Sequence, residues 1–153
     1  MDKEIKKKIL RNWFKILQEV ICNDIENLEN GSAKFISENW NKHKSKDEGG
    51  GEYRILTKGK IFEKVGVNFS EVYGKFDKKM KKNIPGAKKN PNYYATGISI
   101  VMHMKNPHIP AMHFNTRYIY TTFGWFGGGI DVTQSIDDLE EKKWFHNELK
   151  KTC

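Results

Sequence analysis

Apolar side chains recur at spacings of three and four positions through the first thirty residues, which is the period of an α-helix. This pattern predicts one long amphipathic helix over residues 2–29. Asn30 and Gly31 follow it, and these residue types adopt the left-handed backbone conformation that commonly ends a helix. The recurring apolar positions are Ile5, Ile9, Trp13, Ile16, Leu17, Val20, Ile21, Ile25 and Leu28.

The pattern changes after this helix. A weaker helical spacing continues over residues 33–42, and the polar, glycine-rich segment 44–53 predicts a flexible loop. Segments rich in β-branched and aromatic residues then follow, interrupted by Gly, Asn and Pro, as is typical of strands. The predicted strands lie in residues 52–57, 60–74, 93–103 and 112–123.

The last part of the sequence returns to a helical pattern. A helix is expected to begin near Asp137, because Glu140 three residues later completes a pattern that resembles a capping box. The order of helix, strands and helix favours an α+β fold, with an antiparallel β-sheet flanked by helices. The length of 153 residues suits a single domain over residues 1–153.

Three consecutive glycines, Gly127, Gly128 and Gly129, interrupt the strand-like segment WFGGGIDVT. Glycine adds no side chain to a core, so three in a row indicate a tight turn or the close approach of another group to the backbone. The sequence alone leaves both interpretations open.

Charge and composition narrow the class of protein. The net charge is +8, but the lysines occur in short separate runs without a nucleic-acid motif, so nucleic acid is not the expected main partner. A basic surface suits a small polyanionic substrate equally well. No segment is apolar enough to span a membrane, and Cys22 and Cys153 lack metal-ligand spacing. We expect a cytoplasmic protein with two free thiols.

The strongest candidate chemistry lies on two predicted neighbouring strands. Alternation places Ser99 and His103 of one strand, and His113, Asn115 and Arg117 of the next, on one face of a sheet. A pairing centred on the turn between them would set His103 opposite His113 and Ser99 opposite Arg117. Arginine binds carboxylates through two parallel hydrogen bonds, and histidine transfers protons near neutral pH. This face therefore indicates a site.

The quoted segments resemble a known family. GKIFEKVGVNFSEVYG, ATGISIVMHMKNPHIPAMHFNTRYIY and WFGGGIDVT are similar to signature segments of oxygen-dependent coproporphyrinogen III oxidase. The similarity covers nearly the whole chain. It implies a large antiparallel sheet between helix layers, a homodimer, and oxidative decarboxylation of two propionates of coproporphyrinogen III to vinyl groups, which gives protoporphyrinogen IX for heme biosynthesis. Molecular oxygen would be the acceptor, without an organic cofactor, and a divalent metal has been described in the family.

The resemblance also implies roles for individual residues. His113 matches the catalytic proton donor, whereas Ser99 and the tripeptide Asn115, Thr116 and Arg117 match substrate-binding positions. Three histidines match candidate metal ligands, and Asp131, which follows the glycines, is a further candidate for substrate contact. The candidate metal ligands are His103, His113 and His146.

The chain departs from the family in its length, because family members are about twice as long. Two readings follow: the N-terminal portion of an oxidase, or a catalytically inactive remnant that at most binds tetrapyrrole or metal. A basic nucleic-acid-binding module is a third reading, based on charge alone. An exposed sheet edge would also favour self-association or poor expression of the chain.

Overall fold

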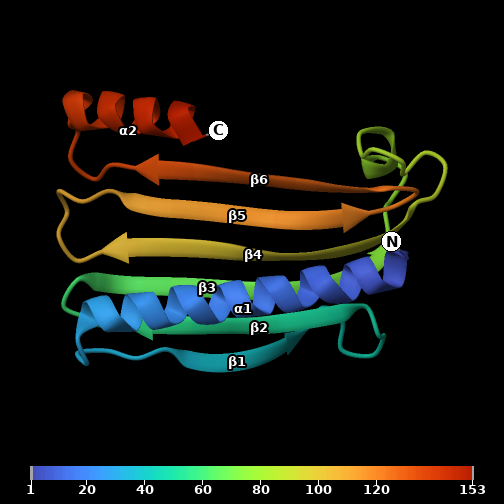
Figure 1. Ribbon diagram of the computed structural model, residues 1–153, viewed down its shortest axis with the longest axis horizontal. Coiled ribbons are helices and arrows are strands. Elements are labelled where there is room, and N and C mark those ends of the chain that lie inside the picture. Colours follow the sequence, from blue (N-terminus) through green and yellow to red (C-terminus); the bar gives the residue numbers. More distant parts are fainter. Residues whose placement is uncertain (1, 153) are drawn as a thin grey trace.

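The architecture is that of a computed structural model, which describes residues 2–152 and places two helices and six strands in one unit (Figure 1). Cys153, one of the two expected free thiols, lies outside the described residues. The elements are α1 (Lys3–Glu29), β1 (Ile36–Asn41), β2 (Gly49–Thr57), β3 (Phe62–Lys75), the 3-10 turn η1 (Met80–Lys82), β4 (Asn92–Met104), β5 (Ala111–Tyr120), β6 (Gly124–Thr133) and α2 (Leu139–Thr152).

The six strands form one sheet in the order β1-β2-β3-β4-β5-β6, in which each strand pairs antiparallel with the next (Figure 1). Short connections join the strands, except that residues 76–91 link β3 to β4 through η1. The expected α+β class with an antiparallel sheet and flanking helices is therefore confirmed.

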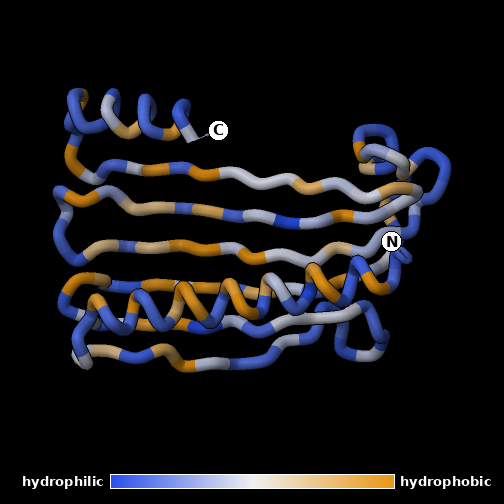
Figure 2. Tube along the Cα trace, viewed as in Figure 1, coloured by the Kyte–Doolittle hydropathy of each residue, from blue (hydrophilic) through white to orange (hydrophobic). Residues whose placement is uncertain are grey.

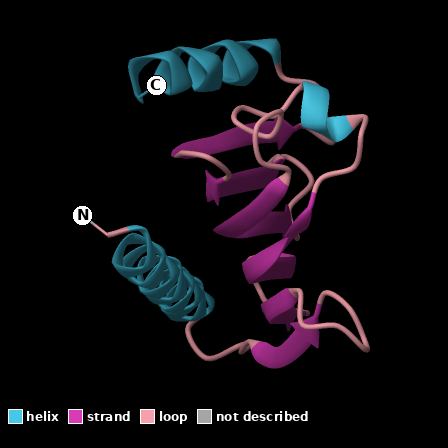
Figure 3. Cartoon of the chain, turned by 90° about the vertical axis from the view of Figure 1, so that its right-hand side faces the viewer, coloured by secondary structure: helices cyan, strands magenta, loops and turns pink. Residues whose placement is uncertain are grey.

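The α1 helix lies across one face of the sheet. Figure 3 shows the helix on that side of the strands only. Its Phe14, Cys22 and Ile25 pack into the core between helix and sheet. Strand alternation directs apolar side chains of β2, β3, β4 and β5 toward the helix. The buried core members on these strands are Leu56, Phe62, Val65, Val67, Phe69, Tyr94, Ile98, Ile100 and Tyr118.

The ends of α1 follow the expected chemistry. The Asp2 side chain accepts hydrogen bonds from the backbone N–H groups of Glu4 (2.8 Å) and Ile5 (3.2 Å), which caps the first turn. Asn30 adopts the left-handed conformation (φ 49°, ψ 47°) at the other end. The helix predicted over residues 2–29 is therefore confirmed.

The helix has a second apolar stripe, which does not face the sheet. It is formed by large side chains that are each about half exposed, and Figure 2 shows apolar positions along the whole helix. The sheet contacts the stripe of Phe14 and Cys22 instead, because only one side of a helix can face a sheet. The exposed stripe consists of Ile5, Ile9, Trp13, Ile16 and Val20.

Two expectations for the following segment are wrong. Residues 36–41 form β1 instead of the helix expected over 33–42, and Gly49, Gly50 and Gly51 begin β2 instead of lying in a loop. The physical reason is pairing between the two segments, since Trp40 lies opposite Gly51. A Cβ atom on Gly51 would lie 2.9 Å from the Trp40 ring, so this glycine makes room for the indole.

A buried carboxylate fixes the end of α1 to the sheet. Glu29 is only 1% exposed and accepts hydrogen bonds from the backbone N–H groups of Lys60 (2.6 Å), Ile61 (3.0 Å) and Phe62 (2.7 Å), and from the Ser32 hydroxyl. Burial alone would raise the pKa of Glu29, but these hydrogen bonds lower it to about 2. The carboxylate thus takes the place of water as the hydrogen-bond acceptor for the backbone N–H groups of the turn before β3.

The C-terminal helix α2 begins two residues after the expected Asp137. Asp138 caps it by accepting hydrogen bonds at 3.0 Å from the N–H groups of Glu140 and Glu141. Among the described residues, no helix combines the length and apolar character required to cross a bilayer. Cys22 is a free, buried cysteine, and burial raises the pKa of its thiol to about 11.

Candidate functional site

The face of the sheet opposite α1, called the open face here, carries most of the candidate residues. Strand pairing sets Ser99 beside Asn115, and Asn115 beside Gly129. The next row along the strands contains Val101, His113 and Asp131. The sheet therefore brings polar groups of three successive strands together, as alternation predicted for β4 and β5.

The exact pairing differs from the expected one by two residues. Val101, and not His103, lies opposite His113, while Gly97 takes the place expected for Ser99 opposite Arg117. The 105–110 turn is not symmetric about its centre, because β4 continues to Met104 before β5 begins at Ala111. A shift of two residues preserves the face on which each side chain lies, so the composition of the open face is unchanged.

Two histidines and one carboxylate lie near one another on this face. The ring centroids of His103 and His113 are 6.2 Å apart in an edge-on arrangement. The Nδ1 atom of His113 lies 3.8 Å from Oδ2 of Asp131, and Thr133 donates a hydrogen bond to the same oxygen at 3.2 Å. An imidazole beside a carboxylate is suited to holding or transferring a proton.

Arg117 supplies a cation beside these groups on the open face. Its Nη1 atom donates a hydrogen bond to Oδ1 of Asn115 at 2.6 Å, and its side chain is exposed. This hydrogen bond orients the exposed guanidinium. A carboxylate approaching the open face can therefore meet a positioned arginine.

The three glycines lie inside β6, so their interpretation as a tight turn is wrong. Strand pairing sets Gly127, Gly128 and Gly129 directly opposite Arg117, Thr116 and Asn115. A Cβ atom on Gly127 or Gly129 would meet only the side chains of Arg117 or Asn115, at 3.7 Å. The glycines therefore leave the sheet bare beside the arginine and the amide, where a flat group can approach the backbone.

Two of the predicted site residues on the strands do not share this face. Thr116 and Gly128 lie on the α1 side of the sheet, because alternation reverses them relative to Asn115 and Arg117. Phe126 is also on that side, where its ring lies 5.2 Å from Tyr118. Of the two aromatic residues before the glycines, only Trp125 has the alternation of the open face.

The three candidate metal ligands are not brought together. His146 belongs to α2 and lines a cavity of about 450 Å³ with Met104 and Met112, whose side chains lie on the α1 side. His103 and His113 are on the open face. Within residues 2–152 no three His, Cys, Asp or Glu side chains form a group that could hold a metal ion. The described residues therefore do not fit a three-histidine metal site.

Asn68 and Trp40 extend the open face beyond the predicted residues. Asn68 of β3 pairs with Ser99, and its Oδ1 accepts a hydrogen bond at 2.8 Å from Nε1 of Trp40. The signal in the sequence was a polar residue between the apolar residues Val67 and Phe69. It was missed because the pairing of β3 with β4 depends on a long connection.

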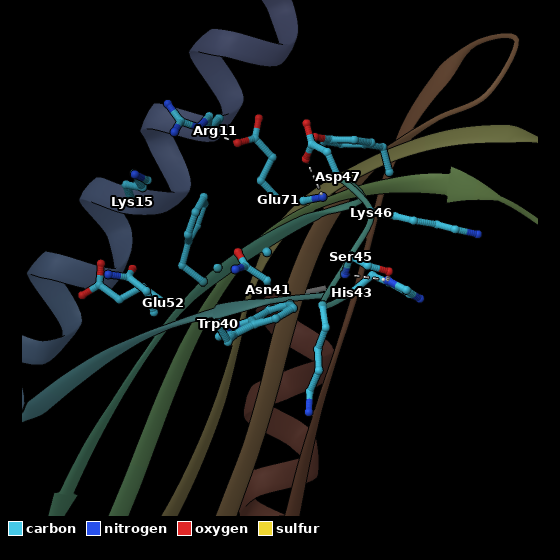
Figure 4. Close-up of a pocket in the computed structure, with 17 residues that line it drawn as sticks. Arg11, Lys15, Trp40, Asn41, His43, Ser45, Lys46, Asp47, Glu52 and Glu71 are labelled. Atoms are coloured by element: carbon cyan, nitrogen blue, oxygen red, sulfur yellow. Dashed lines mark hydrogen bonds and ion pairs between the residues drawn. The ribbon is translucent and has the colours of Figure 1, made fainter.

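A separate cavity lies on the other side of the sheet, between α1 and the start of β2 (Figure 4). Its volume is about 650 Å³. Its charges largely satisfy one another, since Arg11 donates to Glu71 at 2.6 Å and the same carboxylate accepts from Tyr94 at 3.0 Å. None of the site residues predicted from the sequence lines this cavity, although Trp40 does.

Comparison with known proteins identifies related sequences. Residues 9–153 match the family model described as coproporphyrinogen III oxidase. The oxygen-dependent coproporphyrinogen-III oxidases of Rickettsia bellii (strain RML369-C) and Rickettsia akari (strain Hartford) are each 43% identical over 155 residues. Each match covers 96% of this chain and 54% of the relative. The chain thus spans about half the length of the curated relatives it matches.

Proposed function

Because the chain belongs to the coproporphyrinogen III oxidase family, we propose that its open face is one wall of a coproporphyrinogen III site. The single observation that carries this proposal is the row of glycines opposite Asn115 and Arg117 on an uncovered sheet face. It combines space for a flat macrocycle with groups that recognise carboxylates.

The substrate chemistry matches these groups. Coproporphyrinogen III carries four propionates, so a positioned guanidinium and a positive net charge favour its binding. Arg117 binds one propionate, and Asn115 keeps the guanidinium oriented. Ser99 lies beside Asn115 in the same row, and its hydroxyl donates a hydrogen bond to the substrate or accepts one from it.

The proposed reaction is oxidative decarboxylation. In each round a propionate, one proton and molecular oxygen give a vinyl group, carbon dioxide and hydrogen peroxide, so that O₂ accepts two electrons. His113 is the group that supplies or receives the proton, and the Asp131 carboxylate lies beside it. The described residues use no organic cofactor in this scheme, and no step is assigned to a metal.

The proposal includes the finer fold and the assembly of the family. The sheet would be part of the large antiparallel sheet between helix layers of coproporphyrinogen III oxidases, which the resemblance also implies to be homodimers. The covered and open faces of the present sheet are compatible with such a layered arrangement.

Turnover with defined variants tests the proposal. Anaerobically prepared coproporphyrinogen III is mixed with the protein and air, and product is measured by the fluorescence of the oxidised porphyrin. We expect His113→Ala to lower the rate by about 10²- to 10⁴-fold, the usual contribution of a general acid or base. His108→Ala, in the exposed 105–110 turn, is the matched control and should retain activity.

Binding separates the two readings of the chain. Loss of both binding and turnover in Arg117→Ala supports an active site on the open face. Binding of coproporphyrin that depends on Arg117, without turnover by the wild type, would instead support a tetrapyrrole-binding remnant. Binding that is indifferent to Arg117→Ala and Ser99→Ala would reject the open face as the site.

A further inference from the structure

Two of the lysine runs lie close together in the connection between β3 and β4, at one end of the molecule. Residues 75–91, which are the last residue of β3 and its connection to β4, contain seven lysines and one acidic residue, Asp77. Asp77 is occupied by the backbone, since it accepts hydrogen bonds from the N–H groups of Lys79 and Met80. The lysines are Lys75, Lys78, Lys79, Lys81, Lys82, Lys88 and Lys89.

These lysines have no acidic partners in the described part of the chain. None of the seven takes part in an ion pair within residues 2–152. The start of α1 lies at the same end of the molecule (Figure 1). Its Lys3 and Lys8 line a hollow together with Asn90 and Tyr93. Two of the lysine runs and the basic start of α1 therefore lie at the same end of the folded protein.

The connection is held to the sheet by the neighbouring turn. Thr121, which is 2% exposed, donates a hydrogen bond at 2.8 Å to the carbonyl of Pro85, and Ala87 is fully buried. We call residues 75–91 and 121–123 together the basic cap. Its lysines thus project from an anchored surface, and Figure 2 shows the 76–91 connection as largely hydrophilic.

Exposed apolar side chains lie among these lysines. Met80 is 49% exposed and Phe123 is 52% exposed. Phe123 shares a hollow with Ile84 and with Lys82, Lys88 and Lys89. Apolar tips surrounded by lysines are the arrangement by which peripheral proteins contact a bilayer, with the tips between headgroups and the ammonium groups at the lipid phosphates.

We infer that the basic cap docks this protein on the surface of a membrane that contains anionic lipids. Clusters of four to eight basic residues are attracted to such surfaces. The cap contains lysine and no arginine, whereas nucleic-acid surfaces commonly use arginine and several stacking aromatics. Half-exposed Met80 and Phe123 give the cap an apolar component that a phosphate backbone would not require.

Sedimentation with vesicles tests the inference on the whole chain. The wild type should bind phosphatidylcholine vesicles that contain about 30% phosphatidylserine, and not vesicles of phosphatidylcholine alone. Replacing Lys78, Lys79, Lys81 and Lys82 by Gln should weaken binding by about tenfold or more. The matched control replaces Lys142, Lys143, Lys150 and Lys151 of α2 by Gln, which removes the same charge elsewhere and should leave binding within about twofold.

A second variant separates membrane from nucleic acid. Met80→Ser with Phe123→Ser should weaken vesicle binding about threefold or more, while leaving any binding to a random DNA duplex unchanged. The inference is overturned if the wild type stays in solution with anionic vesicles, or if both lysine variants lose binding equally. It is also overturned if the apolar variant binds vesicles as the wild type does. Circular dichroism melting curves establish that each variant is folded.

Discussion

The two faces of the sheet use the same strands for different purposes. Toward α1, Val67 and Ile98 are at most 3% exposed, and no buried polar side-chain atom of the described residues lacks a hydrogen-bond partner. On the open face, Ser99, His113 and Arg117 retain access to solvent. Alternation along a strand thus lets adjacent residues serve stability and chemistry separately. The comparison predicts that substitutions on one face should leave the property of the other unchanged.

The largest expected effect on stability comes from the covered face. Ile98→Ala removes a side chain that is 3% exposed in the core, and should lower the free energy of unfolding by about 2–5 kcal/mol. Ser99→Ala, one residue along, should change it by less than about 0.5 kcal/mol. Urea denaturation measures both values. Similar losses in the two variants would contradict the division of roles between the faces.

Glu29 provides a pH-dependent test of the covered side. Its pKa is lowered from an ordinary 4.5 to about 2, so its contribution is complete above about pH 4.5 and is lost as the pH falls toward 2. The shift corresponds to about 3 kcal/mol. We expect Glu29→Gln to lower the free energy of unfolding by about that amount at pH 7. The loss of stability between pH 4.5 and pH 2 (the acid limb) should also become smaller in this variant, as measured by urea denaturation at several pH values.

An exposed carboxylate serves as the control for this prediction. Glu140→Gln on α2 removes the same charge, and should change the free energy of unfolding by less than about 0.5 kcal/mol. An acid limb in Glu29→Gln as steep as in the wild type would show that the buried carboxylate does not anchor the turn before β3.

Substitutions at neighbouring glycines of β6 test both faces of the sheet. Gly128 faces α1, where a Cβ atom would lie 2.6 Å from the carbonyl oxygen of Asn115, so Gly128→Ala should cost about 1–3 kcal/mol of stability. Gly127→Ala has room, with a nearest distance of 3.7 Å, and should change stability by less than about 0.5 kcal/mol. Its methyl group instead lies on the open face.

Binding completes the test of the glycines. If a flat tetrapyrrole lies against this part of the sheet, Gly127→Ala should weaken coproporphyrin binding by about tenfold, equal to about 1.4 kcal/mol. Fluorescence titration of wild type and variant gives this ratio. Unchanged affinity would place the macrocycle elsewhere on the open face.

The smallest effect on stability is expected on the outer side of α1. Ile9→Lys with Trp13→Lys alters two half-exposed side chains, and should change the free energy of unfolding by less than about 0.5 kcal/mol. Exposed apolar stripes favour self-association, so this variant should shift the protein toward monomer. Light scattering after size-exclusion chromatography measures the shift. A monomeric wild type would refute self-association through this stripe.

Much of the local structure followed from the sequence. The periods of apolar residues located α1, α2 and the segments that became β3, β4 and β5. The prediction of a helix over residues 33–42 was wrong, because residues 36–41 become the strand β1 only when they pair with β2. Trp40 packs over Gly51 in that pairing, and no local spacing records such a contact.

The candidate site was predicted in composition but not in arrangement. Alternation alone assigned Ser99, His113, Asn115 and Arg117 to one face. The turn at 105–110 determined which of them are opposite one another. Sequence similarity assigned a role to Thr116 as well, although its side chain points to the other face of the strand.

The sequence by itself determined which segments are helical or extended and which residues share a face, because both properties depend on neighbours in the chain. Only the tertiary structure decided which stripe of α1 packs on the sheet, that the glycines lie opposite Asn115 and Arg117, that His146 is apart from the other two histidines, and that the basic start of α1 lies at the same end as the basic cap. These features depend on contacts between residues distant in the sequence, whose formation is governed by strand pairing and burial over the whole sheet.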